Sequence, residues 1–187
     1  MSHIILDSNF YLPMPTTLVG MNIKGKPNFC AVGWISRVNY KPTMIAVALY
    51  KTHYSPIGIK ENKTFSVCIP NAQLVKQTDY CGIVSGKTVD KSKLFTVFYG
   101  KTKTAPMIKQ CPINIECKLE KTIILPSDYL FIGKVVTVFV EKKYLTNGKI
   151  DYKKVNPFIF TLPDRIYSVL GKKIGNAYSI GKVLKKK

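Results

Sequence analysis

The chain has 187 residues, of which 46% are hydrophobic and 11% aromatic. This length suits one domain with a real core over residues 1–187, and the composition excludes a disordered or low-complexity chain. Twenty-nine basic residues against 10 acidic ones give a formal net charge of +19. Such a charge suits phosphate backbones, but all but two of the basic residues are Lys, whereas base-edge recognition favours Arg. We therefore expect a solvated basic surface and no specific nucleic-acid binding.

Four apolar runs in the first half have the length and residue types of β-strands, at residues 17–24, 28–36, 43–50 and 64–70. A tight turn at 25–27 is expected to join the first two. Ser55 and Pro56 follow the third run, and Ser at the N-cap with Pro at the first helical position predicts a short helix that ends at Asn62. A second helix is expected from its N-cap at Asn71 to about Val84.

The second half contains the two longest predicted strands, at residues 112–125 and 128–140, and a hairpin turn at Asn147-Gly148. A short final strand is expected near residues 158–160. About seven strands and two helices then make one mainly β domain. A closed barrel is the natural way to remove the edges of its sheet.

Alternation within the two long strands assigns faces to particular side chains. In the strand from 128, Leu130 and Ile132 are expected to face the barrel interior, which turns Tyr129 toward the outer, partner-facing surface. In the other strand, Cys111 and Cys117 are expected on one face, too far apart for a disulfide or a shared metal. The chain has five cysteines and no CxxC pair, so we expect reduced, buried thiols.

Motifs of the common enzyme classes are absent. Gly86-Lys87-Thr88 lacks the earlier glycine of a P-loop, and neither GxGxxG nor GxSxG occurs. The two histidines, His3 and His53, make neither a His-rich metal site nor a Ser-His-Asp set. The uncharged stretch at residues 8–23 contains two prolines and two asparagines, so it is neither a membrane span nor a signal-peptide core. We expect no catalytic side chain, no metal, no membrane association and a cytoplasmic location.

The most informative segment is YKTHYSP at 50–56, where a buried strand runs directly into a capped helix. Alternation puts Lys51 and His53 on the same side, next to the unsatisfied N–H groups and the positive dipole end of the helix. Lys51 as a point charge, His53 as a donor and the Ser55 hydroxyl would together bind a terminal phosphate. The alternative is that Ser55 only caps the helix and that Lys51 is solvated.

A series of short motifs occurs in a characteristic order over nearly the whole chain. The series includes GKPN at 25–28, GW at 33–34, KTHYS at 51–55, DYCG at 79–82, SG at 85–86, DK at 90–91 and YSIGK at 178–182. In this order the motifs resemble the flavin reductase-like family, and in particular its flavoredoxin branch. The resemblance implies a split β-barrel that binds FMN non-covalently at the interface of a homodimer.

The resemblance also implies candidate flavin contacts. They fall on Asn28 and Trp34 beside the ring system and ribityl chain, on Ser55, Lys51 and His53 at the phosphate, and on Lys91 as a further cation. Taken alone, Trp34 is more often a core residue and Lys91 more often faces solvent. The family often has Gly-Asp-His where this chain has Ser127-Asp128-Tyr129. Tyr129 would then stand near the isoalloxazine in place of a His, and it would not titrate near neutral pH.

Three functions are compatible with these expectations. The first is an FMN-dependent oxidoreductase that takes electrons from NAD(P)H and passes them to an acceptor, with the cofactor supplying the chemistry. The second is a flavoredoxin-type electron carrier that a protein partner reduces without NAD(P)H turnover, and for it the charge of +19 favours docking to an acidic redox partner. The third is a basic nucleic-acid-binding barrel without flavin.

Overall fold

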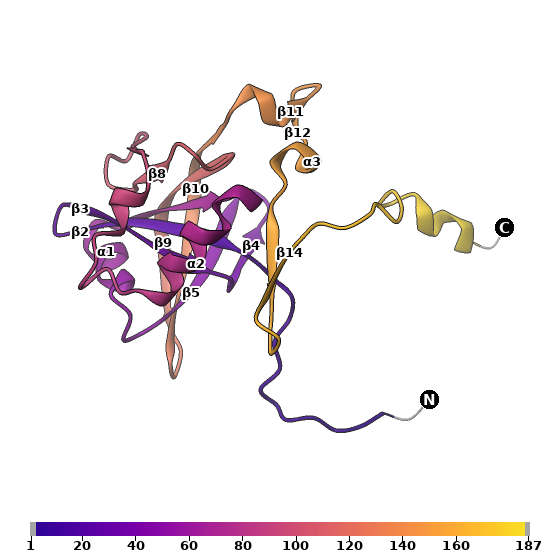
Figure 1. Ribbon diagram of the computed structural model, residues 1–187, viewed down its shortest axis with the longest axis horizontal. Coiled ribbons are helices and arrows are strands. Elements are labelled where there is room, and N and C mark those ends of the chain that lie inside the picture. The colour runs from indigo at the N-terminus through magenta and orange to yellow at the C-terminus, as the bar shows by residue number, and fades with distance from the viewer. Residues whose placement is uncertain (1–2, 186–187) are drawn as a thin grey trace.

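The computed structural model describes residues 3–185 and is organised around one antiparallel sheet of seven strands (Figure 1). In sheet order the strands are β3 (Lys26–Val32), β2 (Thr17–Ile23), β6 (Thr64–Ile69), β9 (Ile113–Ile124), β10 (Asp128–Val140), β5 (Met44–Tyr50) and β4 (Ile35–Asn39). The sheet wraps around an apolar core. The expected mainly β architecture with a few short helices is confirmed.

Shorter elements surround this sheet. The other strands are β1 (Met14–Pro15), β13 (Phe158–Thr161) and β14 (Ile166–Val169) in a small sheet, and the pairs β7 (Val97–Phe98) with β8 (Met107–Ile108) and β11 (Leu145–Thr146) with β12 (Lys149–Ile150). The α-helices are α1 (Ser55–Asn62), α2 (Val75–Ile83) and α3 (Tyr152–Val155). The 3₁₀ turns are η1 (Ala72–Leu74), η2 (Lys91–Leu94), η3 (Lys142–Tyr144) and η4 (Ile180–Leu184).

The core consists of two buried clusters that pack on opposite faces of the sheet. Alternate residues of β2 supply both clusters, because Val19 lies in the first and Leu18 in the second. Ile59 of α1 packs into the first cluster, which lies inside the barrel. Cys81 of α2 packs into the second. The two helices therefore cover different faces, and the segments that flank them meet beside β3.

The predicted orientation of β10 is wrong. Phe131 is fully buried in the first cluster, and a side chain at Gly133 would lie 2.5 Å from the ring of Phe65. Tyr129, Phe131 and Gly133 therefore face the barrel interior, while Leu130 and Ile132 lie on the outer face, half-buried. Both faces of this strand are apolar, so alternation alone does not identify the inner one. The close fit of Phe65 against Gly133 decides it.

Several predicted boundaries also change. The predicted strand 28–36 is divided between β3 and β4, and the turn before it lies at Lys24 and Gly25, which both have positive φ angles. The N-cap of α1 is Tyr54 instead of Ser55, and neither Tyr54 nor Asn71 makes a side-chain capping bond. The hairpin turn predicted at Asn147-Gly148 is confirmed between β11 and β12.

The cysteines are free thiols, as expected, and all except Cys30 are buried. Burial raises the pKa of the Cys68 and Cys117 thiols to about 12, so both are protonated and unreactive at neutral pH. Cys111 precedes the first residue of β9 and packs in the second cluster, whereas Cys117 packs in the first. The prediction that these two share a face is wrong because the strand starts after Cys111.

Both ends of the chain leave the barrel as arms (Figure 1). The N-terminal arm, residues 3–13, leads into β1, and the C-terminal arm, residues 170–185, follows β14. Every described residue of the C-terminal arm is exposed. Both arms start at the small sheet, which lies beside β3 and α2.

Candidate functional site

A hollow of about 270 Å³ lies where β3, the connection from β5 to α1 and the end of α2 meet. His53 and Ser55 line it from one side, Cys30 and Ala31 from β3, and Lys91 from the segment after α2. Residues from three separate parts of the sequence thus converge on one small space. Polar donors and apolar walls occur together in it, as they do in cofactor sites.

Ser55 is the central polar group of this hollow. Its side chain is 4% exposed, and its hydroxyl oxygen accepts a hydrogen bond from Asn28 Nδ2 at 3.4 Å. Asn28 Nδ2 also lies 3.3 Å from Met21 Sδ, which fixes the amide in the barrel wall. A hydroxyl can accept and donate at the same time, so the Ser55 O–H can donate to the Cys30 sulfur or to an anion in the hollow.

Lys91 supplies a buried positive charge. It is 3% exposed, and its Nζ donates to the carbonyl oxygens of Cys81 and Val84, both at 3.1 Å. No carboxylate of residues 3–185 lies within ion-pair distance of it. An ammonium group has three N–H donors, so one remains for a ligand. The alternative that Lys91 faces solvent is excluded, because the carbonyls at the end of α2 bind it.

The thiol of Cys30 borders the same hollow. Burial raises its pKa, and the hydrogen bond with Ser55 and the charge of Lys91 offset this effect only in part. The thiol is therefore protonated at neutral pH. Its Sγ lies 3.8 Å from the carbonyl oxygen of Val19, so it acts as a weak donor.

Two further hollows continue from this one along β3. One, of about 240 Å³, is lined by Ala31, Trp34, His53 and Asp128 among others, and the other, of about 350 Å³, by Ala31, Trp34, Ile83 and Tyr167 among others. The three share Ala31, so they form one groove, which we call the β3 groove. Trp34 is 50% exposed on it, which excludes the alternative that this residue belongs to the core.

Small residues keep the β3 groove open. A methyl group at Gly82 would lie 3.4 Å from Cβ of Ala31, so any larger side chain there would reduce the width of the slot. Gly86 is tighter still, because a methyl group would lie 2.0 Å from Asn28 Oδ1. A narrow slot beside Trp34 with cationic and hydroxyl donors at one end fits the shape and the charge of the flavin mononucleotide expected from the sequence.

The candidate residues separate into two groups. Asn28, Trp34, His53, Ser55 and Lys91 lie on or directly behind the β3 groove. Lys51 and Tyr129 line none of its three hollows.

Lys51 and Tyr129 are held elsewhere by their own contacts. Lys51 Nζ donates to the carbonyl oxygen of Pro126 at 2.9 Å, and Lys60 Nζ lies 3.3 Å from the ring centre of Tyr129. The hydrogen bond with Lys60 lowers the pKa of the Tyr129 phenol, and the positive charges of Lys60 and Lys51 add to this effect.

Sequence reasoning did not place Cys30, Ala31, Gly82 or Gly86 at the site, although both glycines belong to motifs that carry the family resemblance. Cys30 and Ala31 lie within a predicted strand, and only the closure of the barrel shows that they border a hollow. The short CGIVSG segment at 81–86, unusually rich in small residues after a helix, was the available signal.

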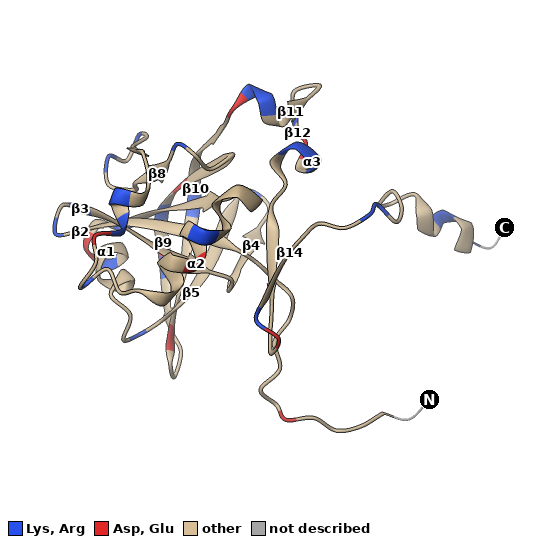
Figure 2. Ribbon diagram, viewed as in Figure 1, with Lys and Arg blue, Asp and Glu red and all other residues tan. Residues whose placement is uncertain are grey.

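A basic hollow adjoins the site. It measures about 350 Å³, shares Gly86 and Lys91 with the first hollow, and is also lined by Lys24, Lys26 and Lys87. Lys and Arg otherwise lie on all parts of the molecule, including the C-terminal arm (Figure 2). A local cluster of lysines therefore adjoins the end of the groove that holds Lys91.

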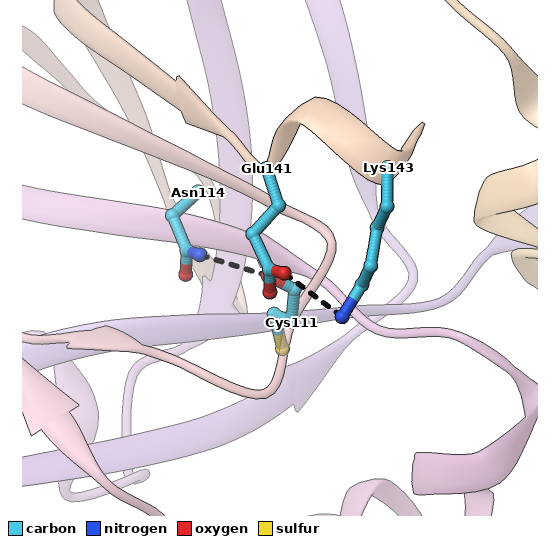
Figure 3. A network of polar contacts seen from close by, with 4 residues as sticks. All are labelled: Cys111, Asn114, Glu141 and Lys143. Atoms are coloured by element: carbon cyan, nitrogen blue, oxygen red, sulfur yellow. Dashed lines mark hydrogen bonds and ion pairs between the residues drawn. The ribbon is translucent and has the colours of Figure 1, made fainter. Parts of the chain in front are cut away.

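A separate hollow of about 480 Å³ lies near the opposite end of β10, lined by Asn114 and Glu141 among others. Asn114 Nδ2 donates to the carbonyl oxygen of Cys111 at 3.1 Å, and Glu141 pairs with Lys143 at 2.8 Å (Figure 3). Asp128 borders the β3 groove at the other end of this strand, roughly 40 Å away at 3.3 Å per residue. These contacts secure the strand end and do not belong to the groove.

Within residues 3–185, no three His, Cys, Asp or Glu side chains are arranged to bind a metal ion. The same part of the chain contains no helix with the length and apolar character needed to span a membrane.

Comparison with known proteins agrees with this geometry. Flavoredoxin from Methanosarcina acetivorans is 49% identical, with 98% of this chain and 100% of that chain covered at a TM-score of 0.97. Flavoredoxin of Desulfovibrio vulgaris (Miyazaki F) is 32% identical, and the match covers 97% of this chain and 100% of that chain with a TM-score of 0.90. An FMN-binding protein from Thermus thermophilus shares the fold at 19% identity, with a TM-score of 0.78 over 94% of this chain and 97% of that chain. The model of the flavin reductase like domain matches residues 10–155, and with the expected split barrel in place the chain belongs to that family.

Proposed function

We propose that this protein binds FMN in the β3 groove and acts as an oxidoreductase that carries electrons from NAD(P)H to an acceptor. The observation that carries the proposal is the convergence of Ser55, His53 and Lys91 on one end of a slot whose other end holds an exposed Trp34. The similarity to two flavoredoxins and to a protein named as FMN-binding supports the choice of flavin.

The chain's own residues bind and orient the cofactor in this proposal. The Ser55 hydroxyl donates to the phosphate while its oxygen accepts the bond from Asn28. The ammonium group of Lys91 and the imidazole of His53 add charge and a further donor. Lys51 stays in the predicted contact set, but it would reach the phosphate only by releasing the Pro126 carbonyl.

Trp34 borders the ring end of the slot and excludes water from one side of it. Tyr129 stays in the predicted contact set because of its family position, although it lines none of the three hollows of the β3 groove. Bound FMN supplies the redox chemistry, because its ring accepts hydride and passes the electrons on. No side chain has to act as an acid or a base in this scheme.

The active unit is proposed to be a homodimer. Trp34 is half-exposed and Ile83 is 72% exposed on the groove, which leaves the proposed flavin ring partly open to water in a single copy. A symmetric pair would cover it. Light scattering at micromolar concentration with FMN present tests this, and a particle of one chain would contradict it.

The flavin proposal is tested by the absorption spectrum of the purified protein before and after denaturation. Steady-state oxidation of NADH and NADPH, with a dye as acceptor, then tests the electron donor. A colourless protein that does not take up added FMN would refute the cofactor.

A second function is an electron carrier that receives electrons from a protein partner. The two proteins named flavoredoxin and the charge of +19 favour it. A yellow protein that oxidises neither NADH nor NADPH, yet is reduced by an acidic redox protein in a salt-sensitive reaction, would select this function.

A further inference from the structure

The C-terminal arm carries a large apolar surface that its own barrel does not cover. Ile174 is 95% exposed and Tyr178 99%, and Ile180, Val183 and Leu184 are also exposed. Scattered apolar residues are normal on a surface, but five of them along one projecting segment are typical of an interaction site. In a single copy these side chains contact water.

The arm has a defined local shape. Asn176 accepts backbone hydrogen bonds from Ser179 at 3.3 Å and Ile180 at 3.0 Å, and η4 follows. The turn is close enough that a methyl group on Gly175 would lie 2.4 Å from Cδ1 of Ile180. Tyr178 adopts a φ of 59°, which is unfavourable for a bulky residue.

An experimentally solved relative follows the same course. The flavoredoxin crystal structure superposes on 98% of this chain with a TM-score of 0.97. The arm makes up nearly a tenth of the chain, so a score this high requires that the arm projects there as well. An ordered segment without contacts to its own barrel must gain contacts elsewhere to offset its loss of conformational entropy. A second copy of this chain is the partner that the proposed homodimer already supplies.

The β3 groove is a matching surface for the arm. Trp34 and Ile83 are exposed on it, and both arms start beside it, because Tyr11 and Tyr167 line the same hollow. The chain has 10 acidic residues in total, and two of them, Asp79 and Asp128, line this groove. The arm carries the opposite charge on four lysines of its described part, Lys172, Lys173, Lys182 and Lys185.

We propose that the C-terminal arms are exchanged in the dimer, so that the arm of each copy packs on the other copy's β3 groove at Trp34 and Ile83. The partner's arm then closes the ring end of the cofactor slot, and each site is incomplete in a single chain. This inference rests on the proposed flavin-binding dimer and specifies how the dimer covers the flavin. An isologous exchange of this kind gives two identical closed sites.

The test is photo-crosslinking between two isotopically distinct copies of the full chain. Tyr178 is replaced by p-benzoylphenylalanine in a normal-isotope chain, which is mixed with uniformly heavy wild-type protein and left to exchange subunits with FMN present. Irradiation and peptide mass spectrometry should then yield light–heavy crosslinks to the peptides that contain Trp34 or Ile83. The same crosslinker at Tyr152, exposed on α3, is the matched control and should give none at these peptides.

Crosslinks confined to light chains, crosslinks to heavy peptides outside the groove, or a dimer without arm crosslinks would each overturn the proposal. A second variant, Val183→Asp, should weaken dimerisation by about tenfold or more, since it places a charge in an apolar contact. Asn176→Asp, a variant on the same arm, should change the strength of dimerisation much less. Dimerisation that is equally strong in both variants refutes the inference. The absorption spectrum of each sample separates the outcomes, because bound flavin without arm contacts refutes only the exchange, and a colourless protein refutes the proposed function.

Discussion

The substitution Ser55→Ala tests the phosphate end of the site most directly. It removes a hydroxyl that is 4% exposed and leaves the backbone of α1 unchanged. A hydrogen bond to a charged group contributes about 1.5–3 kcal/mol, so the Kd for FMN should rise roughly 10- to 150-fold. Riboflavin lacks the phosphate, and its affinity should stay within about twofold of wild type.

The structure also predicts a small cost in stability. Asn28 Nδ2 loses the Ser55 oxygen and keeps its contact with Met21 Sδ. Loss of one neutral hydrogen bond should lower the free energy of unfolding by about 0.5–1.5 kcal/mol. Urea unfolding of the flavin-free protein measures this term separately from binding.

Quenching of flavin fluorescence during titration gives both affinities. Ser36→Ala is the matched control, since the Ser36 hydroxyl is exposed and bonds only to the next carbonyl. Lys51→Ala should weaken FMN less than Ser55→Ala does, because Lys51 is bound to Pro126. Equal losses for FMN and riboflavin in Ser55→Ala would mean that the phosphate does not lie at this end.

Three further predictions concern the walls of the groove. Gly86→Ala should lower stability by about 1–3 kcal/mol through overpacking, because its methyl group would lie 2.0 Å from Asn28 Oδ1, and it should also weaken the binding of FMN. Gly171→Ala is the control, since Gly171 has open space around it and the change should not measurably alter thermal unfolding. Cys30 is the one half-buried cysteine, so it should react with a thiol reagent before the other four, and bound FMN should slow this reaction. Mass spectrometry identifies the labelled cysteine, and an unchanged labelling rate with FMN present would place the flavin elsewhere. Asp90 caps η2 and so positions Lys91. The pKa of the Asp90 carboxyl is lowered, mainly by its hydrogen bond with the Ser92 hydroxyl. Its stabilisation is therefore present above the unfolded pKa of about 3.9 and is lost as pH falls through the lower folded value. Because the carboxylate is exposed and Asn keeps a capping oxygen, Asp90→Asn should lower the free energy of unfolding at pH 7 only slightly and should remove this part of its pH dependence.

The strands could be predicted because their signal is local. The runs at 43–50 and 128–140 became β5 and β10 with almost the expected ends, since apolar content and length identify a strand without knowledge of its partners. The inward face of β10, in contrast, could not be predicted from a local signal. Whether Tyr129 or Leu130 faces inward depends on how Phe65 fits against Gly133, and those two residues lie 68 positions apart.

The site could be predicted only where its residues are close in sequence. The YKTHYSP segment indicated His53 and Ser55 from local spacing, but the partner of Ser55 is Asn28, which belongs to a different strand. The sequence pattern therefore pointed to Ser55, which lines the hollow, but the expected local role as a helix cap is wrong. Lys91 shows the same limit, because the carbonyls that bury it follow from the path of the chain after α2.

The final prediction concerns Tyr129, which is proposed to lie near the flavin ring at a position where the family resemblance leads us to expect a His. Its ring is half-buried with the Lys60 ammonium 3.3 Å from the ring centre and that of Lys51 at 5.8 Å. In Tyr129→His these charges disfavour the imidazolium, so its pKa should fall below the usual value of about 6.5. Below that pH a new positive charge near the ring would favour the reduced flavin.

The reduction potential of Tyr129→His should therefore rise more steeply than that of wild type as pH falls below about 6.5, when followed by dye-equilibrium titration. Tyr144→His is the control, because Tyr144 also lies beside a lysine, Lys143, but follows the far end of β10. Its potential should follow wild type at every pH, and so should that of Tyr129→Phe. If Tyr129→His also follows wild type from pH 5 to 8, the side chain does not approach the isoalloxazine, and its contact with Lys60 only supports the packing of α1 on the barrel.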